Sequence, residues 1–309
     1  MLPSTPGSAT DAVAASLLPK AAGVERRPRP AWLRFMADEP LGAVGLLVVA
    51  TLVVVVALAR FIAPYDPLEV DFMAMLQAPS AAHIMGTDQM GRDVFSRLLY
   101  GGTTALSVGV ISAFLGCTLG ALIGTASAYF GGKIDLYVQR VNDIVLVFPG
   151  IVLAMVIVSL LGRGQVMGLD LNVILAIAIP IVPQVVRVIR SSALTLRELP
   201  YIDAARAAGF SHLRIICRHM APNVMAIYLI LLTVNIAQAI LLEASLSFLG
   251  LGITEPKATW GLMLSGASQY YRDAPWLIIF PGIAIGVTVF AFNLLGDALR
   301  DWLDPRLRR

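Results

Sequence analysis

Three side chains close together in the sequence are of types that bind metals. His83, Asp88 and Asp93 lie within one short segment, and imidazole and carboxylate groups are ordinary metal ligands. Their spacing matches no ligand motif, and the two aspartates lie near glycine and arginine residues, as turn formers and ion partners do. The pattern therefore favours a turn and a short helix packed on the outer rim over a metal site, and we expect no metal.

A carboxylate interrupts a long apolar run. Glu243 stands among Leu, Ala and Ser residues, and an ionisable residue within a membrane span marks a candidate functional site. Counting from Asn223 at about 1.5 Å per helical residue places Glu243 roughly 30 Å along its helix, near the outer surface. Two roles remain open for Glu243: part of an external gate, or a simple anchor at the membrane interface.

The sequence shows neither a catalytic centre nor an energy source. A Walker A loop is absent, because Lys133 is followed by Ile134 and Ser127 occupies the place of the first glycine. Cys117 and Cys217 are far apart and lie in no CxxC motif, so we interpret both as structural thiols. We find no buried nucleophile and no metal cluster. The chain is expected not to be an enzyme, to bind no cofactor itself, and to take its energy from another chain.

The composition places these residues in a membrane protein. Of 309 residues, 58% are hydrophobic and only 14% are charged, too few charges for the surface of a soluble domain. The apolar residues fall in blocks long enough to cross a bilayer core, which takes about 20 helical residues. We therefore predict an all-α membrane protein, since helices satisfy their own backbone hydrogen bonds in lipid. The six predicted spans are Leu41–Ala63, Thr104–Phe130, Val138–Leu161, Leu171–Ile189, Asn223–Leu249 and Trp276–Leu295.

Small residues and prolines recur inside these spans. Small residues allow helices to approach closely, and prolines kink helices whose neighbours supply the lost hydrogen bonds. The residues concerned are Gly116, Gly120 and Gly124 in the second span, Pro149 in the third, and Pro180 and Pro183 in the fourth.

Basic residues predict the orientation of the chain. Six spans put both termini on one side. If that side is the cytoplasm, most of the 23 Lys and Arg residues lie inside, as the positive-inside rule requires. Those left outside are Arg60, Arg92, Arg97, Arg163, Lys257 and Arg272. The net charge of +3 then reflects topology, so nucleic acid is not an expected partner. Residues 1–30 are rich in Pro, Ala and Ser without an apolar signal-peptide core, which predicts a disordered cytoplasmic tail.

The longest basic loop is cytoplasmic in this topology and has the pattern of two short helices. Pro200 suits a first helical turn, Asp203 complements the positive end of that turn, and Gly209 can adopt the left-handed conformation that ends the helix. Ser211 can then cap a second helix, which runs toward Pro222 and the next span. The alanines of the first helix present little bulk, so another protein could approach its backbone closely. An Ala-rich turn that merely links two spans remains the alternative.

The same loop carries a known motif. Asp203-Ala204-Ala205 is followed after three residues by Gly209, after nine more by His219, and after one more by Ala221-Pro222. This pattern resembles the EAA loop of permease subunits of bacterial binding-protein-dependent ABC importers. Asp203 stands where the family has Glu, and Ala221 where it usually has Leu, which keeps the acidic and apolar characters. The resemblance implies that the loop forms coupling helices seated in an ATP-hydrolysing subunit. The coupling residues are then Asp203, Ala204, Ala205, Arg206, Gly209, Phe210, His219 and Pro222.

Further motifs narrow the resemblance to one branch of that family. Similar segments lie at Ala63–Pro67, Gly86–Arg97, Leu242–Gly252 with Trp260-Gly261, and Gly296–Leu307. Together they resemble the second, C-type permease subunit of dipeptide, oligopeptide and nickel importers. The resemblance implies the type I ABC importer permease fold with both termini cytoplasmic, in a bacterial inner membrane and surrounded by lipid. Implied partners are a homologous B-type permease forming a heterodimer, two ABC ATPase subunits that bind ATP and Mg, and an external substrate-binding protein.

The expected organisation and function follow from these patterns. The predicted parts are a cytoplasmic tail over 1–40, a first transmembrane helix over 41–63, an external segment over 64–103, a five-helix permease core over 104–298 with a cytoplasmic coupling loop at 190–222, and a cytoplasmic tail over 299–309. Di- or oligopeptides are the expected substrates on family frequency, with glutathione, nickel chelates or antibacterial peptides as alternatives. An ion-coupled carrier is the alternative from another class. Such a carrier would show repeated halves, discontinuous helices and ionisable residues near the membrane midplane.

Overall fold

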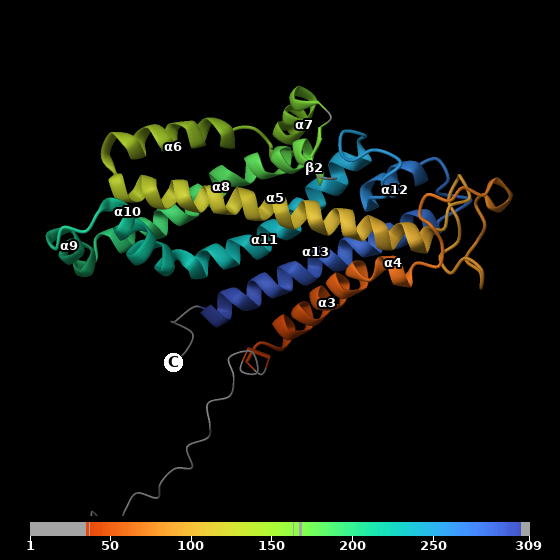
Figure 1. The fold of residues 1–309 in the computed structure, drawn as a ribbon, viewed down its shortest axis with the longest axis horizontal. Coiled ribbons are helices and arrows are strands. Elements are labelled where there is room, and N and C mark those ends of the chain that lie inside the picture. The colour runs from red at the N-terminus through yellow and green to blue at the C-terminus, as the bar shows by residue number, and fades with distance from the viewer. Residues whose placement is uncertain (1–34, 37, 163, 167–168, 304–309) are drawn as a thin grey trace, which may run out of the picture.

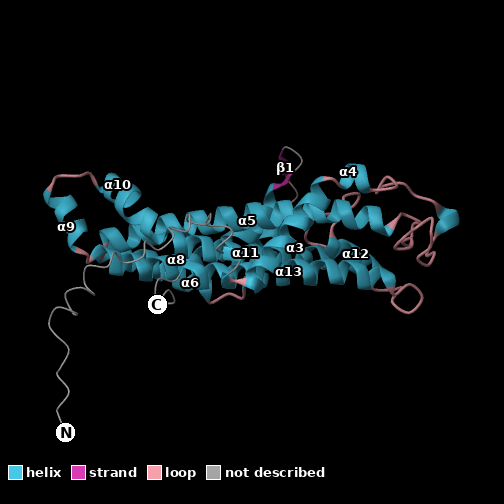
Figure 2. Cartoon of the chain, turned by 90° about the horizontal axis from the view of Figure 1, so that it is seen from below, coloured by secondary structure: helices cyan, strands magenta, loops and turns pink. Residues whose placement is uncertain are grey.

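The computed structural model is an elongated bundle of helices that run nearly side by side (Figures 1 and 2). It describes residues 35–36, 38–162, 164–166 and 169–303, so most of the tail predicted for residues 1–40 lies outside the described residues. The helices are α3 Pro40–Ala57, α4 Ala59–Ile62, α5 Val94–Phe130, α6 Gly132–Leu146, α7 Gly150–Leu161, α8 Leu171–Arg197, α9 Pro200–Ala207, α10 His212–Ile215, α11 Ala221–Phe248, α12 Trp260–Ala267 and α13 Trp276–Leu303. A 3₁₀ turn covers Phe72–Ala74, and a π-helical segment, Ile216–Met220, joins α10 to α11.

Length and hydropathy confirm the membrane prediction, with one correction. Five helices of the described chain can cross a membrane, and α6 with α7 makes a sixth span only if the bent pair counts as one. The axes of these two helices differ by 92° at Pro149, so the third predicted span is two helices and not one. Proline cannot donate the helical hydrogen bond and clashes with the preceding turn, which explains the position of the break.

Two spans are longer than predicted. Helix α5 begins at Val94, inside the stretch that we assigned to the external segment, and has 37 residues. The helical run His212–Phe248 also has 37 residues and carries the second helix of the basic loop straight into the membrane. A departure from the all-α prediction is a two-residue antiparallel pair before α8, in which β1 (Gln165–Val166) pairs with β2 (Leu169–Asp170).

Small residues allow α5 to pack along α8. A Cβ atom added at Gly116 would lie 2.7 Å from the carbonyl oxygen of Ala178, and one at Gly124 would lie 2.8 Å from that of Val186. Real side chains do not approach so closely, so the two backbones are in contact, as the glycine stripe predicted. The main core lies where these helices meet α11.

The first and last described helices pack against each other. The rings of Phe35 and Trp302 meet edge to face with centroids 5.9 Å apart. A Cβ atom at Gly42 would overlap that of Ala298, which places α3 directly on α13. The start of α3 and the end of α13 therefore lie together, toward the end of the bundle that carries α9 and α10 (Figure 1). Helix α13 continues to Leu303, into the stretch predicted as a tail.

Candidate functional site

The α9–α10 segment folds as the helix-start and helix-end residues in its sequence predicted. Helix α9 begins with Pro200 and has Asp203 in its first turn. Gly209 has φ +76°, the left-handed conformation expected of a helix-ending glycine. The Ser211 side chain accepts a hydrogen bond from the Arg214 amide and caps α10. The segment projects beyond the ends of the neighbouring helices (Figures 1 and 2), so its outer face is available to another protein.

Apolar side chains fix this segment to the bundle. Ile202, Ile215 and Met220 are completely buried, and Ala205 is 6% exposed. The sequence had placed Ala205 with the other alanines on the surface facing a partner, and the structure places it on the inner face instead. The face of α9 that points away from the bundle carries the small, exposed side chains of Ala204, Ala207 and Ala208.

Polar and aromatic contacts join the segment to the end of α5. The Tyr129 hydroxyl lies 2.7 Å from Nδ1 of His212, and the Arg206 guanidinium lies 5.2 Å from the Tyr129 ring centroid. Arg206 also pairs with Asp203 at 3.1 Å in an exposed position. Arginine over an aromatic face is attractive, so α5 and α9 are held together through one tyrosine. Sequence reasoning missed Tyr129, because nothing local marks a residue so far from its partner.

Phe210 and His219 form a second contact within the segment. Their rings stack with centroids 5.9 Å apart, and the Arg214 guanidinium lies 4.1 Å from the Phe210 ring centroid. The Asn223 side chain donates to the His219 carbonyl oxygen at 2.6 Å. Pro222 is exposed in the first turn of α11. The predicted coupling residues thus lie in one continuous segment, with aromatic stacking bridging the turn after Gly209.

Glu243 lies at the other end of the same long helix and is fully buried. Its Oε1 accepts a hydrogen bond from Ser247 Oγ at 2.8 Å, and Ser247 Oγ in turn accepts from the Ile253 amide at 3.2 Å. The carboxylate therefore fastens the loop that follows α11 onto the end of that helix. A buried side chain does not face the lipid headgroups, which removes the support for an interfacial anchor.

The loop after α11 contributes Glu255 to a group of four charged side chains. We call this group, which also contains Asp88, Arg92 and Arg97, the outer ionic cluster. Arg92 lies 2.9 Å from Glu255, and Arg97 lies 3.2 Å from the same carboxylate. Arg92 Nε also lies 2.7 Å from Asp88 Oδ2, and the side chains of both arginines are at most 5% exposed. Arg92 and Asp88 are both enclosed, so they attract each other more strongly than an exposed pair does, whereas the Glu255 side chain is 45% exposed. Nothing in the sequence marked Glu255 as a member of this cluster, because it lies in a loop far from the two arginines along the chain.

The candidate metal ligands serve as turn formers and ion partners, as the spacing favoured. Asp93 caps α5 by accepting from the Ser96 amide at 2.8 Å, and its other oxygen lies 3.0 Å from Nδ1 of His83. Asp88 accepts from the Met90 amide at 2.8 Å. The expected short helix is in fact the first turns of α5. Among the described residues, no three His, Cys, Asp or Glu side chains are placed to share a metal ion.

Helix α6 is joined to α8 by two ion pairs. The three-residue spacing of Arg140 and Asp143 allowed a pair between them, but Asp143 lies 3.0 Å from Arg187 of α8. Nearby, Arg190 Nε lies 2.6 Å from Asp135 Oδ1, which also accepts from Ser127. Both pairs fasten α6 across α8, so they are structural contacts between helices.

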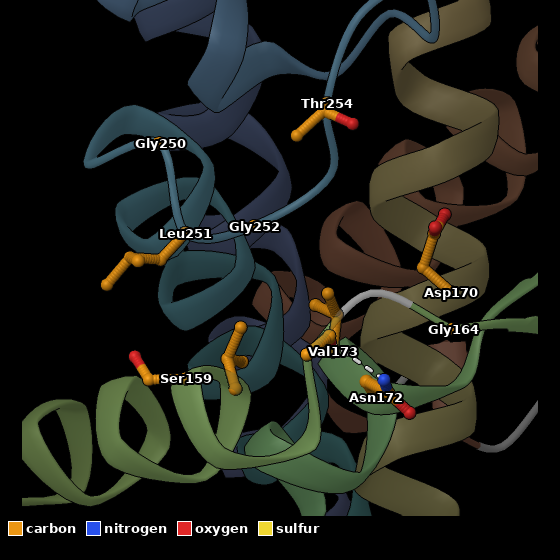
Figure 3. Close-up of a pocket in the computed structure, with 11 residues that line it drawn as sticks. Ser159, Gly164, Asp170, Asn172, Val173, Gly250, Leu251, Gly252 and Thr254 are labelled. Carbon is orange, nitrogen blue, oxygen red and sulfur yellow. Dashed lines mark hydrogen bonds between the residues drawn. The ribbon is translucent and has the colours of Figure 1, made fainter.

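Where α7 and α11 end and α8 begins, α7, α8 and the loop after α11 line a pocket of about 240 Å³ (Figure 3), which we call the outer pocket. Ser159 enters from α7, Asn172 from α8 and Thr254 from the loop, around glycine backbone at Gly250 and Gly252. The side-chain amide nitrogen of Asn172, Nδ2, donates to the Gly162 carbonyl oxygen at 2.8 Å. The pocket is thus lined by polar side chains, glycine backbone and the apolar side chains of Val158, Val173 and Leu251.

Comparison with known proteins identifies the family. The protein-family model described as "binding-protein-dependent transport system inner membrane component" matches residues 116–309. A second family model, for the N-terminal TM domain of oligopeptide transport permease C, matches residues 29–79. A putative peptide transport system permease protein of Brucella suis is 43% identical over 265 residues, which cover 86% of this chain and 88% of the relative. The chain belongs to this permease family. It is therefore a subunit of a bacterial ABC importer in the inner membrane, a transport component and not a catalyst.

Other similar proteins agree with this assignment. A glutathione transport system permease protein of Escherichia coli O6:K15:H31 is 40% identical to this permease over 278 residues, 90% of each chain. An inward-facing structure of the MetNI methionine ABC transporter matches 68% of this permease and 98% of its own chain, with a TM-score of 0.53 and 18% identity. The structural likeness shows that the helical bundle has the ABC importer permease fold.

Proposed function

We propose that this permease subunit lines half of the pathway of an ATP-driven importer of di- or oligopeptides, and that α9 with the following turn docks on an ATPase subunit. The observation that carries the proposal is the open face of Ala204, Ala207 and Ala208 at the projecting end of the bundle. Small side chains let a partner approach the helix backbone. The motif and the geometry thus favour docking over a plain connecting turn.

The way in which α9 and α10 pack on the bundle supports a role in transmitting movement from the ATPase. Ile202 and Ile215 are fully buried, so a pull on α9 moves the bundle instead of bending the loop. The Tyr129–His212 contact passes that displacement to α5, and the unbroken helix His212–Phe248 passes it toward Glu243. We therefore assign Glu243 to the external gate, where the loop that it fastens responds to events at the far end of the helix.

The proposed assembly contains four kinds of chain. A homologous B-type permease completes the pathway, two ATPase subunits bind ATP and Mg, and an external binding protein delivers the substrate. Because the chain lacks a phosphate-binding loop, it contributes no cofactor chemistry of its own. The break between α6 and α7 is a feature also expected of an ion-coupled carrier, but the family matches favour the importer.

Peptide is the substrate class that the relatives support. The similar proteins are described as permeases for peptides and for glutathione, which is itself a peptide. Selectivity within the class is assigned to the binding protein. Nickel chelates and antibacterial peptides are the remaining alternatives.

The test is to purify the tagged chain, gently solubilised, from its native membrane and to identify the proteins that accompany it by mass spectrometry. We expect a second permease and one or two ATPases, and ATP-dependent peptide uptake after reconstitution with the binding protein. A solitary chain that transports without ATP would overturn the proposal.

A matched pair of variants tests the docking surface. Ala207→Arg places a long charged side chain on the exposed face of α9 and is expected to lower ATPase recovery at least about tenfold, because a charge buried without a partner opposes association. Ala81→Arg makes the same change at an exposed alanine of the external segment and is expected to leave recovery unchanged. Equal recovery with both variants would exclude α9 as the docking surface.

A further inference from the structure

A second cavity lies deeper along the same three helices that form the outer pocket. This inner pocket, of about 330 Å³, is lined by the start of α7, the middle of α8 and the middle of α11. Along each helix its residues follow those of the outer pocket toward the centre of the bundle. The two pockets therefore follow one another along the same three helices, and we call this arrangement the track.

Side-chain amides line the inner part of this track. Gln184 lies midway along α8, Asn235 lies near the midpoint of α11, and Gln238 follows about one turn later. Gln184 and Gln238 are exposed on the isolated subunit, whereas Asn235 is 6% exposed and donates to the Leu231 carbonyl oxygen at 2.7 Å. Polar groups facing hydrocarbon without partners are costly, so this face is unsuited to lipid.

The backbone adds further polar groups at the same place. Helix α7 starts at Gly150 beside the inner pocket, directly after the 92° break, and no side chain caps its first turn. The first amide groups of a helix have no partner within it, and they carry partial positive charge. Pro180 of the lining also interrupts the hydrogen-bond ladder of α8. Irregular backbone at membrane depth occurs where it lines a cavity or is buried in protein.

We propose that Gln184, Asn235 and Gln238, with the start of α7, form a polar contact site for the peptide backbone on this subunit's side of the pathway. Side-chain amides offer both donors and acceptors, and so do peptide units, whereas the α7 amides offer donors to carbonyl or carboxylate oxygens. Uncharged groups recognise the feature that all peptides share and do not select among side chains. The inference rests on the proposed function for its choice of substrate.

Cysteine labelling tests whether the track contains water. In a Cys217→Ser background, which removes the exposed thiol but keeps the buried Cys117, we expect Gln184→Cys and Gln238→Cys in the assembled complex to react with a cationic methanethiosulfonate reagent. Ile179→Cys is the control, because this residue is 41% exposed on α8 but lines a different, apolar cavity. We expect the two track positions to react at least about tenfold faster, since the reagent and the reactive thiolate are both hydrophilic.

Uptake tests whether the amides contact the peptide. Gln184→Leu and Gln238→Leu are each expected to lower ATP-dependent uptake of radiolabelled trialanine about fivefold, the effect of losing roughly one net hydrogen bond. Asn293→Leu replaces an intramembrane amide of α13 that does not line the pocket and is expected to transport normally. The second permease and the ATPases are expected to co-purify with every variant.

The outcomes are distinguishable. Unreactive cysteines at 184 and 238, or normal trialanine uptake by both leucine variants, would overturn the polar contact site. Loss of the second permease from the leucine variants would also overturn it, because the amides would then belong to a subunit interface. Failure of the wild-type complex to import either trialanine or glutathione with ATP would instead contradict the proposed function, and labelling would still decide whether the track contains water.

Discussion

Replacing Gly209 by valine isolates the backbone geometry of the coupling segment. Gly209 has φ +76°, and an added Cβ would meet no atom within 4 Å. The substitution therefore causes no steric clash with neighbouring groups, and its cost is conformational. Holding an ordinary L residue in the left-handed region costs about 1–2 kcal/mol, and a β-branched residue lies at the upper end. Since 1.36 kcal/mol corresponds to a tenfold change, the docking-competent geometry becomes about five- to thirtyfold less populated.

The assay compares peptide uptake with ATP hydrolysis by the reconstituted complex. We expect Gly209→Val to reduce uptake per ATP by that factor while the permease still folds and assembles, because Gly209 is exposed and contributes nothing to the core. Gly209→Asn is the matched control, since asparagine tolerates the left-handed conformation and is expected to remain close to wild type. Wild-type coupling in the valine variant, or equal loss in both variants, would refute the reasoning.

Three further outcomes are expected. Glu243→Gln keeps an oxygen that can accept from Ser247 Oγ and is expected to impair transport more than assembly; normal uptake would contradict a gating role. Glu255→Gln removes the carboxylate that pairs with both arginines of the outer ionic cluster and, because the Glu255 side chain is 45% exposed, is expected to destabilise the purified complex by about 1 kcal/mol; an unchanged thermal midpoint would show that the pairs are unimportant. Gly261→Ala would place a Cβ 2.1 Å from the Ala244 carbonyl oxygen and is expected to reduce the amount of folded permease in the membrane severely, which fluorescence size-exclusion chromatography measures; normal yield would show that α12 can shift away from α11.

The sequence was most informative where a signal is local. Apolar runs located the spans, because crossing a bilayer requires a minimum helix length. Pro200, Gly209 and Ser211 located α9 and α10, because helix ends depend on backbone conformation and capping within a few residues. The break before α7 was harder to read. Pro149 marked a kink, but the apolar residues on both sides concealed that the two helices diverge by 92°.

Contacts between distant segments could not be read in this way. Asp143 pairs with Arg187 of another helix and not with its neighbour Arg140, because the packing of α6 across α8 decides which partner is within reach. Glu255 similarly reaches the arginines near the start of α5 from a loop late in the chain. The burial of Glu243 was also missed, since one-dimensional counting gives depth along a helix but not the direction of a side chain.

The helix that runs without a break from His212 to Phe248 constrains the number of residues between Met220 and Glu243. One residue inserted between Met220 and Glu243 would advance the far end by about 1.5 Å and turn it by about 100°. The side chains of Met220 and Glu243 could not then both keep their buried positions. The π-helical segment Ile216–Met220 has the form of an insertion already absorbed, since such a segment holds an extra residue per turn. We therefore expect insertions and deletions in relatives to fall in the loops or to be absorbed by such a π-helical segment.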